Sequence, residues 1–393
     1  MKKYALMVSL LFFTLCLVTT TVFAEEGGES QGENTLDLAP DAKSGILIER
    51  DTGKIMFEKQ AHEKLPPASM TKIMTLLLIM EELEKGSLKK DDVIRISENA
   101  ASMGGSQIFL EAGEEMKVND LLKGIAIASA NDASVAMAER IAGSEAAFVK
   151  KMNEKVKALG LKNTQFQNAS GLPADNHYST AYDMAMIAKE LLSHESITDY
   201  TSIYEDYLRK GTENEFWLVN TNKLVRFYPG VDGLKTGFTN EAKYCLTATA
   251  KKDDMRVVAV VMGAATPKER NATVSNMLDY AFNTYETKKL FDKGQQISEL
   301  EFLKAEDRKV EVVASESIST VFKKGDSIED LTTSVELNSV ELPLKKGDQV
   351  GTLVVKNGKK LISETPLIVE KDVKKASYFT LFKRTIQKLS KND

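Results

Sequence analysis

The sequence is poor in the residues that cross-link exported domains or bind metal ions. Of its 393 residues, only two are cysteine and three are histidine. Cys16 lies in a leading apolar segment, so a processed chain would keep one thiol, Cys245, and no internal disulfide. The histidines have no carboxylate or cysteine companions, and we predict no metal site and no cofactor. Core packing alone must hold such domains together.

The chain also lacks a basic excess. Its formal net charge of -5 argues against nucleic acid as the main partner. The longest apolar run, residues 4–18, follows Lys2-Lys3 and is followed by small residues up to Ala24. This pattern is typical of a secretory signal peptide, residues 1–24, cut after Ala24. The alternative is an uncleaved anchor, for which the run is short.

Composition divides the remaining chain into regions. Residues 25–40 are acidic and rich in small polar residues, which predicts a flexible leader. Residues 41–290 begin and end with strand-like pairs and have helical stretches between them, which predicts an antiparallel sheet with an inserted helical subdomain. Residues 291–373 contain short β-like segments and the hairpin signal Asn357-Gly358, which predict a small all-β domain. The predicted fold class is α+β.

Three local predictions follow for the first domain. Residues 45–57 predict a hairpin whose turn is Asp51-Thr52-Gly53. Cys245 alternates within a strand-like segment, so we expect a core thiol. A helix from about residue 268 to about residue 289 closes the domain.

Residues 374–393 predict a basic amphipathic helix. Phe379, Phe382, Ile386 and Leu389 recur at heptad-like spacing, and basic side chains occupy the rest of the wheel. This pattern is typical of a segment that lies in a membrane interface, and its basic residues suit an anionic surface. The alternative is a terminal helix that docks on its own domain.

One predicted helix carries a chemical signal. Pro66-Pro67 before it and Gly86 after it predict a helix over residues 69–85. Lys72 is the only charged side chain in its first three turns, and an unpaired ammonium there would be costly. Ser69 lies three residues earlier, on the same face. A desolvated, neutral Lys72 could therefore act as general base for a serine nucleophile near the helix N-terminus.

Two further motifs support this pair. Ser129-Ala130-Asn131 lies where one helical stretch gives way to another, and Lys235-Thr236-Gly237 stands at a predicted strand start. Similar motifs occur at Ser87-Leu88-Lys89-Lys90 and Ser97-Glu98-Asn99, but the first of these lies in a charged segment that predicts a solvated turn. In this order the trio is the one found in class A β-lactamases and penicillin-binding proteins.

The sequence resembles the serine D-alanyl-D-alanine carboxypeptidases, the low-molecular-mass penicillin-binding proteins. The resemblance covers most of residues 41–290 and extends to further segments: Gly104-Gly105-Ser106, Asn168-Ala169-Ser170-Gly171-Leu172-Pro173, Tyr178-Ser179-Thr180-Ala181 and Gly233-Leu234. It implies a β-lactamase/transpeptidase-like sheet flanked by helices, then a small β domain and an amphipathic anchor. Ala130, where glycine is usual, and Phe238, where histidine is frequent, bear on peptide preference and β-lactam sensitivity.

The resemblance implies a role for each motif residue. Ser69 would attack the carbonyl of the penultimate D-Ala, and Lys72 would take its proton. Ser129 would pass a proton to the departing D-Ala amine, and Asn131 would hold Lys72 and the peptide amide.

The third motif would bind the substrate. Lys235 and Thr236, with Gly237, would hold the terminal carboxylate. The backbone N–H groups of Ser69 and Phe238 would form the oxyanion hole.

The function implied by the resemblance is a D,D-carboxypeptidase, exported and peripheral at the outer face of the cytoplasmic membrane. Its partners would be peptidoglycan stem peptides that end in D-Ala-D-Ala, and β-lactams would acylate Ser69 as covalent inhibitors. The alternatives are a β-lactamase and a catalytically silent wall-binding scaffold of the same fold. Endopeptidase or transpeptidase action on cross-links also stays open.

Overall fold

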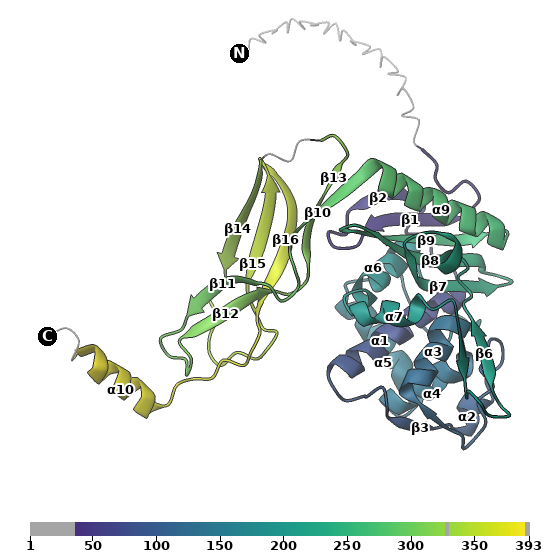
Figure 1. The fold of residues 1–393 in the computed structure, drawn as a ribbon, viewed down its shortest axis with the longest axis horizontal. Coiled ribbons are helices and arrows are strands. Elements are labelled where there is room, and N and C mark those ends of the chain that lie inside the picture. Colours follow the sequence, from purple (N-terminus) through teal and green to yellow (C-terminus); the bar gives the residue numbers. More distant parts are fainter. Residues whose placement is uncertain (1–35, 327–329, 390–393) are drawn as a thin grey trace, which may run out of the picture. The chain divides into compact units, whose positions relative to one another are not determined.

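The computed structural model describes residues 36–326 and 330–389 of the chain. The predicted signal peptide and most of the predicted leader lie outside these residues. The described chain contains a five-stranded antiparallel sheet in the order β2-β1-β9-β8-β7 and a second in the order β11-β12-β16-β15-β14 (Figure 1). The predicted α+β class is therefore confirmed.

The first sheet combines strands from the beginning and from the end of the first domain's sequence. Its strands are β1 (Ser44–Glu49), β2 (Ile55–Lys59), β7 (Val231–Thr239), β8 (Lys243–Lys252) and β9 (Met255–Ala264). The helical elements between β2 and β7 are η1 (Ala68–Thr71), α1 (Lys72–Glu84), α2 (Glu98–Ala101), α3 (Val118–Ala128), α4 (Asn131–Ala142), α5 (Glu145–Ala158), α6 (Ala181–Leu191), η2 (Glu195–Ile197), α7 (Thr198–Thr201) and α8 (Leu224–Phe227). Two short ribbons lie among them: β3 (Val93–Arg95) with β4 (Glu115–Lys117), and β5 (Glu205–Leu208) with β6 (Phe216–Val219).

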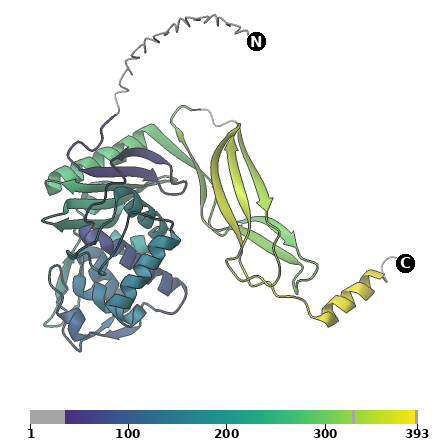
Figure 2. The same cartoon turned by 180° about the vertical axis from the view of Figure 1, so that it is seen from behind.

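Side-chain alternation buries both faces of this sheet. Ile46 and Val260 pack into a core with α1, α3 and α6. Their neighbours Leu47 and Val261 pack into a second core with α9 (Pro267–Thr284). Figures 1 and 2 show α9 on one face and α1, α3, α4, α5 and α6 on the opposite face. The sheet is consequently a sandwiched layer, and β7 is one of its two edge strands.

Two predicted boundaries are wrong. The strand that carries Lys235 begins four residues earlier, at Val231, because the whole of β7 pairs with β8. The closing helix ends at Thr284 instead of about residue 289. Residues 285–291 form β10 (Tyr285–Phe291), which pairs with β13 (Ile318–Lys323). Tertiary strand pairing overrides the local helical pattern at both places.

The all-β region has a core of its own. Its sheet consists of β11 (Gln296–Glu301), β12 (Lys309–Ala314), β14 (Leu331–Leu337), β15 (Gln349–Asn357) and β16 (Lys360–Val369). Val312, Leu353 and Leu367 are buried together within it. Asn357 pairs with Lys360 across the hairpin, as the Asn-Gly signal predicts. The chain continues into α10 (Tyr378–Leu389). No helix in the described part is both long and apolar enough to cross a membrane.

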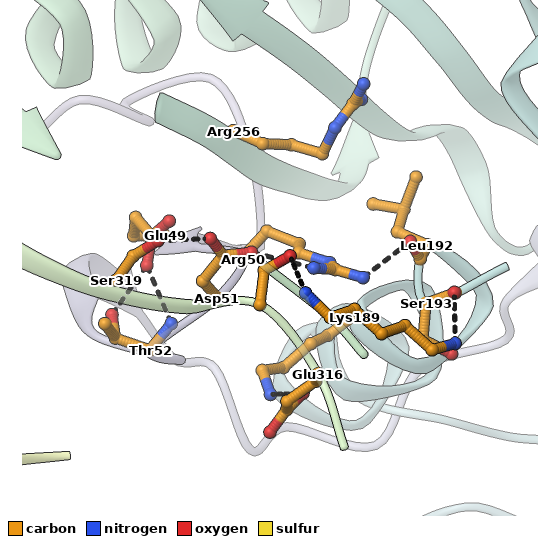
Figure 3. A network of polar contacts seen from close by, with 12 residues as sticks. Glu49, Arg50, Asp51, Thr52, Lys189, Leu192, Ser193, Arg256, Glu316 and Ser319 are labelled. Atoms are coloured by element: carbon orange, nitrogen blue, oxygen red, sulfur yellow. Dashed lines mark hydrogen bonds and ion pairs between the residues drawn. The ribbon is translucent and has the colours of Figure 1, made fainter. Parts of the chain in front are cut away.

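A polar network holds the β1–β2 turn, the end of α6 and β13 together (Figure 3). Arg50 donates through Nη2 to the Leu192 carbonyl at 2.6 Å and pairs through Nη1 with Asp51 at 2.7 Å. The Ser319 hydroxyl donates to the other Asp51 oxygen at 2.6 Å. Because the guanidinium and the carboxylate are both largely buried, each needs these partners.

Gly171 lets the loop after α5 contact the serine turn. The serine turn is η1, the first turn of the serine helix, which carries Ser69 and Lys72. The φ of Gly171 is +86°, and an added Cβ would lie 1.9 Å from the carbonyl oxygen of Ala68. No side chain fits there without moving backbone.

Gly171→Ala should lower the free energy of unfolding by at least about 2 kcal/mol, because it combines a left-handed φ with a backbone clash. Gly86 is a matched control, since its φ is +74° and no described atom lies within 4 Å of an added Cβ. Gly86→Ala should cost about 1 kcal/mol. Thermal or urea unfolding of both variants measures the difference, and equal costs would contradict the close packing.

Candidate active site

The predicted nucleophile lies where the serine helix meets the sheet edge. Ser69 is in η1 and half-buried, and its neighbour Met70 lies in the core. An added Cβ on Gly237 of β7 would lie 2.8 Å from the Pro67 carbonyl and 3.2 Å from the Ala68 Cβ. Glycine at this position therefore permits β7 to approach the serine turn closely.

Lys72 is buried in the first turn of α1, with none of its surface exposed. Its Nζ lies 3.2 Å from Ser69 Oγ, 2.6 Å from Asn131 Oδ1 and 2.6 Å from the Ser170 carbonyl oxygen. Desolvation, and then repulsion from the Lys235 charge, lower the pKa of Lys72 well below its ordinary value.

This arrangement suits a neutral amine. The amide oxygen of Asn131 and the carbonyl of Ser170 can only accept, so each takes one N–H of the Lys72 nitrogen. In a neutral amine, the remaining position on that nitrogen is the lone pair, which faces Ser69 Oγ. The Ser69 hydroxyl can then donate its proton to Lys72.

The second motif lies between α3 and α4, as the sequence predicts. Ser129 ends α3 in the left-handed region, with φ of 65°. Its hydroxyl is buried and has no hydrogen-bond partner among the described residues. Asn131 begins α4, and its Nδ2 donates to the Gly104 carbonyl at 2.7 Å. A strained backbone and an unpaired buried hydroxyl are features expected of a working site.

The third motif supplies a second buried amine. Lys235 is 1% exposed, and its Nζ donates to the Thr236 carbonyl at 3.1 Å. Burial, together with the nearby charge of Arg270, lowers the pKa of Lys235 to about 7. The Thr236 hydroxyl donates to the Thr221 hydroxyl at 2.8 Å. This corner therefore carries positive charge and hydroxyl donors suited to a carboxylate.

Phe238 follows the motif in β7. Its ring is 48% exposed and lies 4.4 Å from the Tyr244 ring, centroid to centroid. Since side chains alternate along a strand, this ring lies on the opposite face of β7 from the side on which Gly237 meets the serine turn.

Several residues that complete the site were missed from the sequence. The Ser170 carbonyl holds Lys72, Thr221 bonds Thr236, and Arg270 acts on the Lys235 charge. Asn168 Oδ1 accepts from the N–H of Gly171 at 2.6 Å and so shapes the loop. The resemblance had marked the Asn168 segment without assigning it a role. A backbone carbonyl and residues distant in the sequence leave no local pattern.

His177 supports the serine turn through a hydrogen bond to Thr71. Burial lowers its pKa to about 4, so the ring is neutral near pH 7. Nδ1 accepts from the Gln167 N–H at 3.1 Å, and Nε2 therefore carries the proton and donates to the Thr71 hydroxyl at 2.8 Å.

The two repeated motifs have structural roles. Ser87 Oγ donates to the Glu82 carbonyl at 3.0 Å, and Lys90 Nζ lies 5.3 Å from the ring centroid of Tyr200. Ser97 caps α2, and its hydroxyl donates to Glu139 at 2.6 Å. Neither copy contributes to a buried amine pair.

Comparison with known proteins identifies the family. Residues 31–266 match the family model described as D-alanyl-D-alanine carboxypeptidase, and residues 285–375 match penicillin-binding protein 5, C-terminal domain. The chain is 57% identical over 359 residues to D-alanyl-D-alanine carboxypeptidase DacF of Bacillus subtilis, covering 91% of this chain and 92% of the relative. It is 34% identical to DacA of Escherichia coli, covering 96% and 94%.

Solved structures show the same fold. Penicillin-binding protein 5 of Haemophilus influenzae has a TM-score of 0.67 at 31% identity, covering 85% of this chain and 98% of that one. Penicillin-binding protein D2 of Listeria monocytogenes, solved in its ampicillin-bound form, has a TM-score of 0.56 at 30% identity, covering 62% and 98%. The chain therefore belongs to the D-alanyl-D-alanine carboxypeptidase family of low-molecular-mass penicillin-binding proteins and is a serine-type hydrolase.

Proposed function

We propose that Ser69 is the nucleophile, and Lys72 the general base, of a D,D-carboxypeptidase that removes the terminal D-Ala from peptidoglycan stem peptides. The observation that carries this proposal is the Lys72 amine, which is fully buried and lies 3.2 Å from Ser69 Oγ. Its two N–H groups are taken by acceptors on Asn131 and Ser170, so its lone pair is available to the serine.

The reaction proceeds through an ester on Ser69. Oγ attacks the carbonyl of the penultimate D-Ala while its proton moves to Lys72. The backbone N–H groups of Ser69 and Phe238 stabilise the oxyanion, each contributing about 3 kcal/mol. The C–N bond then breaks, and the proton taken by Lys72 reaches the leaving D-Ala amine through the Ser129 hydroxyl, which is buried and has no partner among the described residues. Water hydrolyses the ester and frees Ser69.

Lys235 and Thr236 select a free C-terminus. The ammonium of Lys235 and the Thr236 hydroxyl bind the terminal carboxylate of the peptide, and the Arg270 charge adds to the positive potential there. A β-lactam carries a comparable carboxylate and acylates the same serine. No sequence feature identifies a glutamate poised to activate water on the penicilloyl ester, so the ester should persist.

We further propose that the chain is exported through the signal peptide, residues 1–24, and held at the membrane surface by residues 374–393. In α10, Phe379 is 78% exposed and Phe382 is 65% exposed. Arg384 donates to the carbonyls of Ala305 and Glu306 at 2.7 and 2.6 Å. The helix can thus be attached to the β domain and still present aromatic rings to lipid.

The domain limits are also proposals. They are 25–40 for the leader, 41–290 for the D,D-peptidase domain, 291–373 for the β domain and 374–393 for the anchor. The β10–β13 ribbon crosses the limit at residue 290.

Ser69→Ala should form no adduct with benzylpenicillin, and Lys72→Met should lower the acylation rate by about 10² to 10⁴-fold. Intact mass over time measures both. Ser87→Ala and Lys90→Met, in the repeated motif, should acylate like the wild type. An adduct in the Ser69 variant, or an unchanged rate without Lys72, would exclude these roles. Rapid turnover of the penicillin would instead indicate a β-lactamase.

The pH dependence of D-Ala release should be bell-shaped. Lys72 must be neutral, so kcat/KM rises with pH on the acid side. Lys235 must be charged, and with its pKa at about 7 the carboxylate site loses its cation as pH rises above that value. Lys235→Arg keeps the charge at all these pH values. The variant should lose the alkaline limb, and an alkaline limb unchanged in the variant would exclude Lys235 as its source.

Phe379→Ser combined with Phe382→Ser should weaken binding to phosphatidylglycerol vesicles at least about tenfold, because each buried ring contributes about 1.5–3 kcal/mol. Co-sedimentation of the full chain measures this. Leu361→Ser, at a side chain 49% exposed in β16, is the control. Equal binding by all three proteins would rule out the helix as the anchor.

A further inference from the structure

The ribbon of β5 and β6 presents two aromatic rings to solvent from one face. Tyr207 and Trp217 are partners in the register of the two strands, so their side chains lie on the same face. Tyr207 is 43% exposed, and Trp217, the only tryptophan in the chain, is 54% exposed. The next residues along the strands, Leu208 and Leu218, are buried in the core. One face of the ribbon therefore packs on the catalytic domain, and the other, which we call the aromatic face, carries Tyr207 and Trp217.

Packing does not account for this exposure. In the part of the chain that the structure describes, neither ring pairs with a second ring or with a cation. The aromatic residue on the packed face differs, because the Phe216 ring lies edge-on to the Phe109 ring with their centroids 5.7 Å apart. Exposed tyrosine and tryptophan side chains are enriched where proteins bind other molecules.

The ribbon is held in place by ion pairs to the helical part of the domain. Asp206, on the packed face, pairs with Lys123 of α3 at 2.7 Å. Arg209, directly after β5, pairs with Glu114 at 2.6 Å. Because these contacts fix the ribbon in advance, a ligand on the aromatic face does not have to order it.

The aromatic face adjoins the active site. Thr221, whose hydroxyl accepts from Thr236, is four residues after Trp217. Four residues of chain span at most about 14 Å, so the Cα atoms of Trp217 and Thr221 are no farther apart than that. A fully extended stem pentapeptide spans about 18 Å. A polymer that brings a stem peptide to Ser69 therefore has its backbone within reach of this ribbon.

The charges around the aromatic face restrict the class of ligand. Residues 205–219 contain four acidic and two basic side chains, and Glu205 lies on the aromatic face itself. This balance disfavours nucleic acid and anionic lipid. It suits an uncharged ligand whose hydroxyl groups donate to carboxylates and whose C–H groups pack on aromatic rings. Pyranose sugars have both kinds of group.

We infer that the aromatic face binds the sugar backbone of peptidoglycan, a chain of N-acetylated pyranose rings. The inference rests on the proposed function for the identity of the polymer, and on the exposed rings of Tyr207 and Trp217 for the site. Each ring packs on the C–H groups of a sugar, and Glu205 accepts from a hydroxyl. The face thus retains the polymer while Ser69 acts on its stem peptides.

Trp217 reports directly on this site, because no other tryptophan contributes to the emission. The tryptophan fluorescence of the full chain is titrated with tetra-N-acetylchitotetraose, an uncharged chain of N-acetylated pyranoses. We expect a saturable change, and Tyr207→Ser should weaken the binding at least about fivefold, as expected for the loss of one aromatic contact. Phe227→Ser, at a ring 69% exposed outside the aromatic face, should bind like the wild type. No saturable change, or equal binding by Tyr207→Ser, would overturn the inference, and so would a response to phosphatidylglycerol vesicles without one to the sugar.

A second assay connects the site with the reaction. D-Ala release is measured from insoluble, pentapeptide-rich peptidoglycan and from a soluble peptide that ends in D-Ala-D-Ala. Tyr207→Ser combined with Trp217→Ser should slow release from the polymer at least about fivefold and leave kcat/KM for the soluble peptide unchanged. An equal loss with both substrates would assign the rings a structural role and contradict the inference. If the wild type releases D-Ala from neither substrate, the proposed function fails, and the fluorescence titration still decides whether the aromatic face binds sugar.

Discussion

The desolvation of Lys72 is the constraint on which the catalytic domain depends. An ammonium at this position would be shielded from water by α1, α4 and the loop that carries Ser170, and it would face the charge of Lys235. Both effects favour the neutral form, and the two fixed acceptors orient it. The apolar sequence of α1 therefore serves the chemistry as well as the packing. A more hydrated helix would favour the charged form of the Lys72 amine.

The second amine has the opposite task. Lys235 must stay charged when the substrate arrives, although burial lowers its pKa to about 7. An incoming carboxylate raises that pKa again, so substrate binding itself stabilises the ammonium. The two buried lysines thus have different roles because their hydrogen-bond partners differ. Lys72 acts as the base, and Lys235 acts as the cation that binds the anion. Lys72 donates to two fixed neutral acceptors, whereas Lys235 donates to one, the Thr236 carbonyl, and can donate to a bound anion as well.

The features of the fold and of the site that depend on neighbouring residues could be predicted from the sequence. Ser69 and Lys72 share a face because they are three residues apart on a helix. Ser129-Ala130-Asn131 lies at the junction between two helices. The β13 partner that ends α9 early and the carbonyl of Ser170 could not be predicted, because both act across the fold. The same holds for Thr221 and Arg270, which approach Thr236 and Lys235 only after the sheet has formed. Family resemblance identified the loop segments, but their contacts depend on how the chain folds.

The protonation state of Lys72 tests the account most directly. The chain can be labelled with ¹³C and ¹⁵N at lysine, and the side-chain resonance of Lys72 can be assigned by its loss in Lys72→Met and followed from pH 5 to pH 10. We expect the Lys72 resonance to titrate well below the ordinary lysine pKa, as desolvation and the Lys235 charge require. An ammonium resonance that titrates near the ordinary lysine pKa would contradict it.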